Sequence, residues 1–192
     1  MDKFEKIKLG ISIGDFNGIG IEIILKTFSD KRMLDFCTPV LFGATKVISY
    51  HKKALGIETP VHGITSMSQL NHSKINVLNI WKEEVAIELG KTTQFSGDYA
   101  ARSLASAVKH LKENKIDVLV TAPINKELSY SNTFKYSGHT DYLKNILHED
   151  PMMLMVSKNL KLGLLTEHIP LRDVVKEITT KKVIKKINTL RE

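Results

Sequence analysis

"IKLGISIGDFNGIGIE", residues 7–22, is the stretch that decides the fold of this chain. It begins with a short apolar, β-prone run at residues 7–13, passes through a glycine-rich turn and continues as a helical pattern from about Gly20 to Phe28. The turn from a first strand to a first helix is where open α/β sheets bind ligands. Glycines let backbone amides approach an anion closely, and a helix N-terminus favours negative charge.

The glycine turn itself, "GDFNGIGIE" at residues 14–22, leaves two interpretations open. It is not a phosphate-binding Walker A loop, because no Gly-Lys-Ser/Thr follows, and its glycine spacing does not match the dinucleotide-binding fingerprint. A tight strand-to-helix connection without a ligand explains the glycines equally well. Asp15 is the sharper candidate, because an acid at the carboxyl end of a first strand lies where ligands bind.

Short apolar runs alternate with helical patterns along the rest of the chain. Further strands are predicted at residues 39–43, 75–80, 116–123, 151–157 and 161–166. Further helices are predicted at residues 44–55, 96–115, 138–148, 170–178 and 179–190. Gly56 is a natural C-cap, and a turn at Lys158 and Asn159 joins the last two strands. The alternation predicts an α/β fold with a mostly parallel sheet and helices on both faces.

Composition narrows the function classes. The formal charge of +7 would suit nucleic acid or a small anion, but the one dense lysine cluster, residues 181–186, has apolar residues at helical spacing and no interleaved aromatics. We therefore expect the solvated face of an amphipathic helix and no nucleic-acid partner.

No apolar run is long enough for a membrane span or a signal peptide, so we expect a cytoplasmic protein with no membrane partner. Cys37 is the only cysteine, so a metal would need His, Asp or Glu ligands.

Three more segments carry candidate site residues. "TAPINK" (121–126) ends a predicted buried strand and brings Asn125 and Lys126 to its carboxyl end, although a solvated loop lysine is the simpler interpretation. "YSGHTDYL" (136–143) places His139 and Thr140 at a helix start, where a threonine is usually an N-cap but free amides would also suit an anion. "TEHIPLRD" (166–173) places His168 just beyond a strand, as a metal ligand or general base.

These four segments, in this order, carry a resemblance to a known family. "GDFNGIGIE", "TAPINK", "GHTDYL" and "TEHIPLRD" match GDPxGIGPE-like, TAPINK, GHTEYL and TTHIPLRD signatures. The chain therefore resembles the 4-hydroxythreonine-4-phosphate dehydrogenases of pyridoxal phosphate (vitamin B6) biosynthesis. Each match alone is weak, but four collinear matches over about 160 residues are jointly specific.

The resemblance implies a homodimeric enzyme with the fold of the isocitrate and isopropylmalate dehydrogenases. It also implies NAD and a divalent metal (Zn, Mg or Co) as cofactors. The implied reaction oxidises a small phosphorylated hydroxy amino acid to a β-keto acid that loses carbon dioxide. Carried over to this sequence, His139 and Thr140 would bind substrate and His168 would be one metal ligand. Asp15, Asn125 and Lys126 are candidate contacts to substrate or cofactor.

The resemblance covers only the N-terminal half of such an enzyme. We expect residues 1–192 to form its first domain and the start of the second, and the C-terminal half, with the other two metal histidines and most of the NAD site, to be absent. We therefore hypothesise that the chain alone is inactive. Phe16, Asn17, Ile21 and Glu167 depart from the family pattern, and Asp141 replaces a glutamate. The departures leave room for an erythronate or threonate derivative as substrate, or for a non-catalytic remnant that binds phosphate esters.

Overall fold

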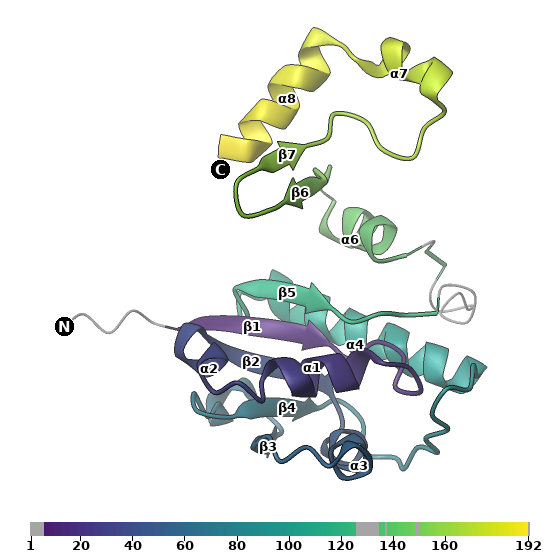
Figure 1. Ribbon diagram of the computed structural model, residues 1–192. Coiled ribbons are helices and arrows are strands. Elements are labelled where there is room, and N and C mark those ends of the chain that lie inside the picture. The colour runs from purple at the N-terminus through teal and green to yellow at the C-terminus, as the bar shows by residue number, and fades with distance from the viewer. Residues whose placement is uncertain (1–5, 126–134, 137, 149, 192) are drawn as a thin grey trace, which may run out of the picture. The chain divides into compact units, whose positions relative to one another are not determined.

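The computed structural model describes residues 6–125, 135–136, 138–148 and 150–191. The chain divides into two compact units, residues 1–142 and 143–192. A five-stranded sheet with the order β3-β4-β2-β1-β5 forms the first unit, and every neighbouring pair in it is parallel (Figure 1). The strands are β1 (Ile7–Ser12), β2 (Cys37–Gly43), β3 (Val61–Ile64), β4 (Ile75–Asn79) and β5 (Val118–Thr121).

Helices cover both faces of this sheet, as the alternation of apolar side chains along β2 shows. Leu41 belongs to a core shared with α1 (Gly20–Thr27) and α3 (Thr45–Leu55). Its neighbours Val40 and Phe42 belong to a second core, which contains Ala107 of α4 (Gln94–Lys112). Successive side chains of a strand point to opposite faces, so α4 lies across the sheet from α1 and α3 (Figure 1). The predicted α/β class, with a mostly parallel sheet and helices on both faces, is confirmed.

The predicted elements of the first unit are found with small shifts at their ends. Gly56 is the left-handed C-cap of α3, with a φ of 64°. Thr93 caps α4, because its side chain accepts a hydrogen bond from the amide of Ser96. Three elements in the described part of this unit were not predicted: β3, the single-turn α2 (Met33–Phe36) and the 3-10 helix η1 (Met67–Gln69). The strand β3 has only four residues, including a glycine, and pairing with β4 rather than an apolar pattern defines it.

One buried hydroxyl joins α4 to the neighbouring strands β1 and β2. The amide of Ile13 donates to Ser103 Oγ at 2.9 Å, and Ser103 Oγ donates to the carbonyl oxygen of Phe42 at 2.6 Å. Ser103 is fully buried, so neither backbone group has water as an alternative partner. The hydroxyl therefore fixes α4 at the carboxyl ends of β1 and β2.

The second unit contains a two-stranded antiparallel sheet and two helices. The strands β6 (Leu154–Val156) and β7 (Lys161–Gly163) pair around a turn in which the Ser157 amide donates to the Leu160 carbonyl. The helices α7 (Leu171–Glu177) and α8 (Thr180–Arg191) follow, and α6 (His139–Leu147) spans the boundary between the units. All of these elements were predicted, and α6, predicted at residues 138–148, is one residue shorter at each end. How the chain divides between the two domains of a longer enzyme stays a prediction.

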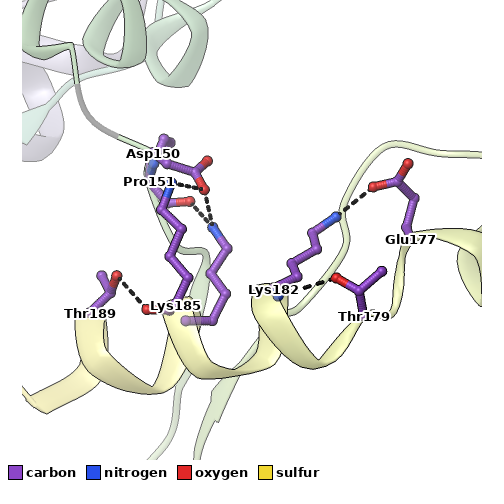
Figure 2. A network of polar contacts seen from close by, with 8 residues as sticks. Asp150, Pro151, Glu177, Thr179, Lys182, Lys185 and Thr189 are labelled. Atoms are coloured by element: carbon purple, nitrogen blue, oxygen red, sulfur yellow. Dashed lines mark hydrogen bonds and ion pairs between the residues drawn. The ribbon is translucent and has the colours of Figure 1, made fainter.

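A lysine of α8 contradicts the expectation of a wholly solvated basic face. Lys186 is 6% exposed, and its Nζ donates to the Pro151 carbonyl at 2.6 Å and lies 3.5 Å from the carboxylate of Asp150. Lys185 reaches the same carboxylate at 3.1 Å (Figure 2). These contacts lower the pKa of Asp150, mainly through the hydrogen bond from Lys185. The two lysines thus anchor α8 to the segment that precedes β6.

No helix in the described parts of the chain combines the length and the apolar character that crossing a bilayer requires.

Replacing Ser103 with alanine should lower the free energy of unfolding by about 2 kcal/mol, because it leaves the Ile13 amide and the Phe42 carbonyl without this partner. Ser106→Ala, on the same helix but only partly buried, is the matched control and should cost less than about 0.5 kcal/mol. Urea unfolding followed by circular dichroism measures both. Equal costs for the two variants would contradict the assigned role of Ser103.

Candidate functional site

The glycine turn after β1 packs against the segment that follows β5. Gly14 has a φ of 66°, and a Cβ at this position would collide with the carbonyl oxygen of Pro123. The next amide, that of Asp15, donates to the same carbonyl at 3.0 Å. Only glycine fits here, because the conformation is left-handed and the other backbone occupies the place of a side chain. The carboxyl ends of β1 and β5 are thereby held together.

Asp15 and Asn17 shape this turn from within. Asp15 Oδ1 accepts a hydrogen bond from the Asn17 amide at 2.8 Å, and the Asp15 carbonyl accepts one from the Gly18 amide at 3.0 Å. Short side-chain-to-backbone bonds of this kind stabilise turns. One oxygen of the candidate carboxylate therefore has a structural role.

Asn17 connects the turn to the long segment between β4 and α4. It is buried, and its side chain accepts from the Glu88 amide at 2.9 Å and donates to Thr93 Oγ1 at 3.3 Å. Its carbonyl accepts from the Gly90 amide at 2.8 Å. Asn17, which departs from the family pattern, therefore holds this segment in place through these hydrogen bonds. No pattern in the sequence indicated these partners, which lie more than 70 residues away.

Phe16 anchors the turn in the core. Its buried ring makes edge contacts with Phe95 and Tyr99, at centroid distances of 6.3 and 5.9 Å. Its carbonyl lies 2.8 Å from His51 Nε2, and because a carbonyl can only accept, His51 donates. Burial lowers the pKa of His51, which favours the neutral ring. His51 had no assigned role in the sequence, yet it supports the candidate site.

A charged and aromatic cluster holds the residues after β4. Glu83 Oε1 accepts from Arg102 at 2.6 Å and from the Tyr99 hydroxyl at 2.8 Å. The guanidinium of Arg102 lies over the rings of Tyr99 and Trp81, 4.6 and 5.6 Å from their centroids. These hydrogen bonds lower the pKa of Glu83 to about 2, and the one from Arg102 has the largest effect. We call Trp81, Glu83, Tyr99 and Arg102 the Glu83 cluster.

Polar atoms without partners gather at the carboxyl edge of the sheet. Ser12 Oγ, Thr45 Oγ1 and Trp81 Nε1 are buried and make no hydrogen bond to any described residue. Ser12 ends β1, Thr45 follows β2, and Trp81 follows β4. Buried polar groups are nearly always paired, so this edge has hydrogen-bonding capacity available for water or a ligand.

The predicted site residues other than His168 fall into three groups. Asp15 and the partly buried Asn125 lie on the two backbone segments that the Asp15–Pro123 hydrogen bond joins. His139 and Thr140 begin α6. Lys126 lies outside the described residues, so its predicted position is untested.

His168 belongs to the second unit and lies between β7 and α7. Its side chain is exposed and its φ is 53°, a left-handed conformation that is uncommon for residues other than glycine. An exposed imidazole is a suitable single ligand for a divalent cation. In the described part of the chain, however, no group of three or more His, Cys, Asp or Glu side chains could hold a metal ion. His168 alone does not make a complete site.

Comparisons with known proteins identify relatives over nearly the whole chain. The family described as "Pyridoxal phosphate biosynthetic protein PdxA" matches residues 35–192. A 4-hydroxythreonine-4-phosphate dehydrogenase of Bacteroides thetaiotaomicron is 38% identical over 184 residues, which is 95% of this chain and 50% of that protein. A "Putative D-threonate 4-phosphate dehydrogenase" of Fusobacterium nucleatum is 30% identical over 95% of this chain and 56% of its own length.

Solved structures agree with the fold. The crystal structure of a 4-hydroxythreonine-4-phosphate dehydrogenase from Burkholderia phymatum matches with a TM-score of 0.87 and 26% identity, over 96% of this chain and 57% of that one. The chain spans about half the length of the curated relatives it matches.

His51→Leu should destabilise the protein by about 1–3 kcal/mol, because it leaves the buried Phe16 carbonyl without a donor. His51→Gln keeps a donor and should cost less than half as much. Thermal unfolding at pH 7.5 compares the two variants. Equal destabilisation would show that ring packing, rather than the hydrogen bond, is what His51 supplies.

Glu83 should make the stability of the fold decrease at low pH. Its pKa falls from an ordinary 4.5 to about 2 on folding, so its contribution is complete above about pH 4.5 and is lost as pH falls through about 2. Glu83→Gln should therefore flatten the decrease in Tm between pH 5 and pH 2.5. Glu58→Gln, which changes an exposed glutamate outside the Glu83 cluster, is the control. An unchanged slope in Glu83→Gln would contradict this assignment.

Proposed function

Because this chain belongs to the PdxA family of pyridoxal phosphate biosynthetic proteins, we propose that it supplies the N-terminal half of a 4-hydroxythreonine-4-phosphate dehydrogenase. The observation that carries the proposal is the family match over residues 35–192, which contains the "TAPINK", "GHTDYL" and "TEHIPLRD" segments. The name of the Bacteroides relative, at 38% identity, supports the same substrate.

In this proposal the phosphorylated substrate binds at the carboxyl edge of the sheet. His139 and Thr140 contact it from the first turn of α6, and Asp15, Asn125 and Lys126 are the further candidates for contact to substrate or cofactor. The unpaired polar atoms of Ser12, Thr45 and Trp81 at the same edge support a polar ligand there. The basic character of the chain also suits a phosphate group.

The cofactors we propose are NAD and a divalent cation (Zn, Mg or Co). His168 would supply one ligand, and the others would come from residues equivalent to the second half of the relatives. A bound divalent cation would favour loss of the proton from the substrate hydroxyl and stabilise the negative charge that develops as hydride leaves for NAD. The product would be a β-keto acid that decarboxylates. Because the described residues hold no complete ligand set, we expect the 192-residue chain alone to be inactive.

We also propose that the functional protein is a homodimer. The second unit leaves large apolar side chains exposed, among them Met155 and Val156 of β6 and Leu171 and Val175 of α7. Exposed apolar groups at this density are typical of surfaces that another polypeptide covers.

A second candidate substrate is a phosphorylated threonate or erythronate. The Fusobacterium relative, named for D-threonate 4-phosphate, is 30% identical over nearly the same residues. The departures from the family pattern at Phe16, Asn17 and Glu167 are compatible with such a change. The alternative without catalysis is a remnant that only binds phosphate esters. In that case, binding should not depend on metal.

A chimera tests the proposal. Residues 1–192 of this chain replace the corresponding half of the Bacteroides enzyme, and NADH absorbance is followed with either substrate and Zn, Mg or Co. We expect metal-dependent turnover of 4-phosphohydroxythreonine by the chimera and none by the 192-residue chain. Steady turnover by the chain alone would refute its predicted inactivity, and preference for threonate 4-phosphate would favour the second substrate.

His168→Asn in the chimera should lower kcat/KM by at least about 100-fold, the upper range for the loss of groups that merely support a metal ligand. Asparagine accepts the positive φ of this position, so the backbone is preserved. His62→Ala on β3 is the matched control and should change kcat/KM less than about twofold. A His168→Asn chimera with full activity would refute the metal-ligand role.

A further inference from the structure

A basic depression lies at the amino-terminal edge of the sheet, the edge opposite the glycine turn. Its volume is 280 Å³, and it is lined by residues that precede β1, β2, β3 and β4. Because all five strands are parallel, these segments meet at one edge of the sheet. No role proposed above uses them.

Positive charge dominates the rim of this depression. Among the described residues that line it, Lys6, Lys31 and Lys74 are basic and Asp35 is acidic. Asp30, the acid next to Lys31 in sequence, is already paired with Arg32 at 2.6 Å. Three ammonium groups around one depression produce a positive field that attracts a multiply charged anion.

The floor of the depression is apolar. Phe28 and Leu34, which are buried in the core, are among the residues that line it, together with Pro60. An apolar floor under a cationic rim suits a ligand that has one anionic group and one flat apolar part. A volume of 280 Å³ limits this ligand to a small molecule.

One wall of the depression is held in place before any ligand binds. The side-chain Nδ2 of the buried Asn76 donates to the carbonyls of Asn71 and Lys74, at 2.9 and 3.2 Å. The ring of His72 is 2.8 Å from Thr38 Oγ1, and Lys6 Nζ donates to the His72 carbonyl at 3.3 Å. A preorganised wall lowers the entropic cost of binding.

We propose that this depression binds a small phosphomonoester with an aromatic or similarly flat apolar body. The three lysines would surround the phosphate dianion, for which lysine is a common partner, and the Phe28–Leu34–Pro60 floor would contact the apolar body. This inference does not rest on the proposed dehydrogenase function, because the lining residues and the residues assigned to that function do not overlap.

Phenyl phosphate is the probe, titrated into the ¹⁵N-labelled 192-residue chain and followed by amide chemical shifts. We expect saturable shifts at Lys31, Ser73 and Lys74. The double variant Lys31→Ala/Lys74→Ala should weaken binding by at least about tenfold, which corresponds to about 1.4 kcal/mol. Both side chains are exposed, so the variant should fold normally.

Two control variants and two control ligands make the test decisive. Lys53→Ala, an exposed lysine on α3, should change the Kd less than twofold, and Lys31→Arg/Lys74→Arg should retain most of the affinity. Inorganic phosphate should bind more weakly than phenyl phosphate, and benzyl alcohol should not saturate. Shifts confined to the glycine turn at residues 14–18, no saturable binding, or equal weakening by Lys53→Ala would each overturn the proposal. A failed chimera with intact phenyl phosphate binding would refute only the dehydrogenase proposal.

Discussion

The close approach of Gly14 to the Pro123 carbonyl is the constraint on which the rest of the first unit depends. A side chain at Gly14 would separate β1 from the segment after β5, because the other backbone occupies its place. The hydrogen bond from the Asp15 amide to the same carbonyl then sets the direction in which the turn leaves the sheet. That direction determines the positions of Phe16, Asn17 and the helix α1. The turn is therefore both the structural junction of the sheet and the predicted ligand-binding edge.

Much of the fold could be predicted because it is encoded locally. The alternation of short apolar runs with helical periods predicted the strands β1, β2, β4 and β5 and the helices α1, α3 and α4 in their correct order. Gly56 predicted a helix end because only its conformational freedom suits a left-handed cap. The strand β3 was not predicted, because its four residues include a glycine and show no clear apolar alternation. Its pairing with β4 is what defines it as a strand.

The supporting contacts of the candidate site could not be predicted, because they join residues far apart in sequence. His51 looked like an ordinary helix residue, and only the folded chain brings it to the Phe16 carbonyl. Lys186 was predicted to be solvated, and the carbonyl of Pro151, 35 residues earlier, explains its burial. By contrast, Asp15, His139, Thr140 and His168 were identified through motifs, and their proposed roles in binding depend on the family rather than on a contact in this structure.

The central claim is that this chain contributes one imidazole, that of His168, to a metal site completed by other residues. The most direct measurement is an anomalous diffraction map from zinc-soaked crystals of the chimera. We predict a zinc peak about 2.0–2.1 Å from a ring nitrogen of His168, the normal zinc–histidine distance, with the remaining protein ligands outside residues 1–192. A zinc ion bound entirely by residues of this chain, or bound without His168, would contradict the claim.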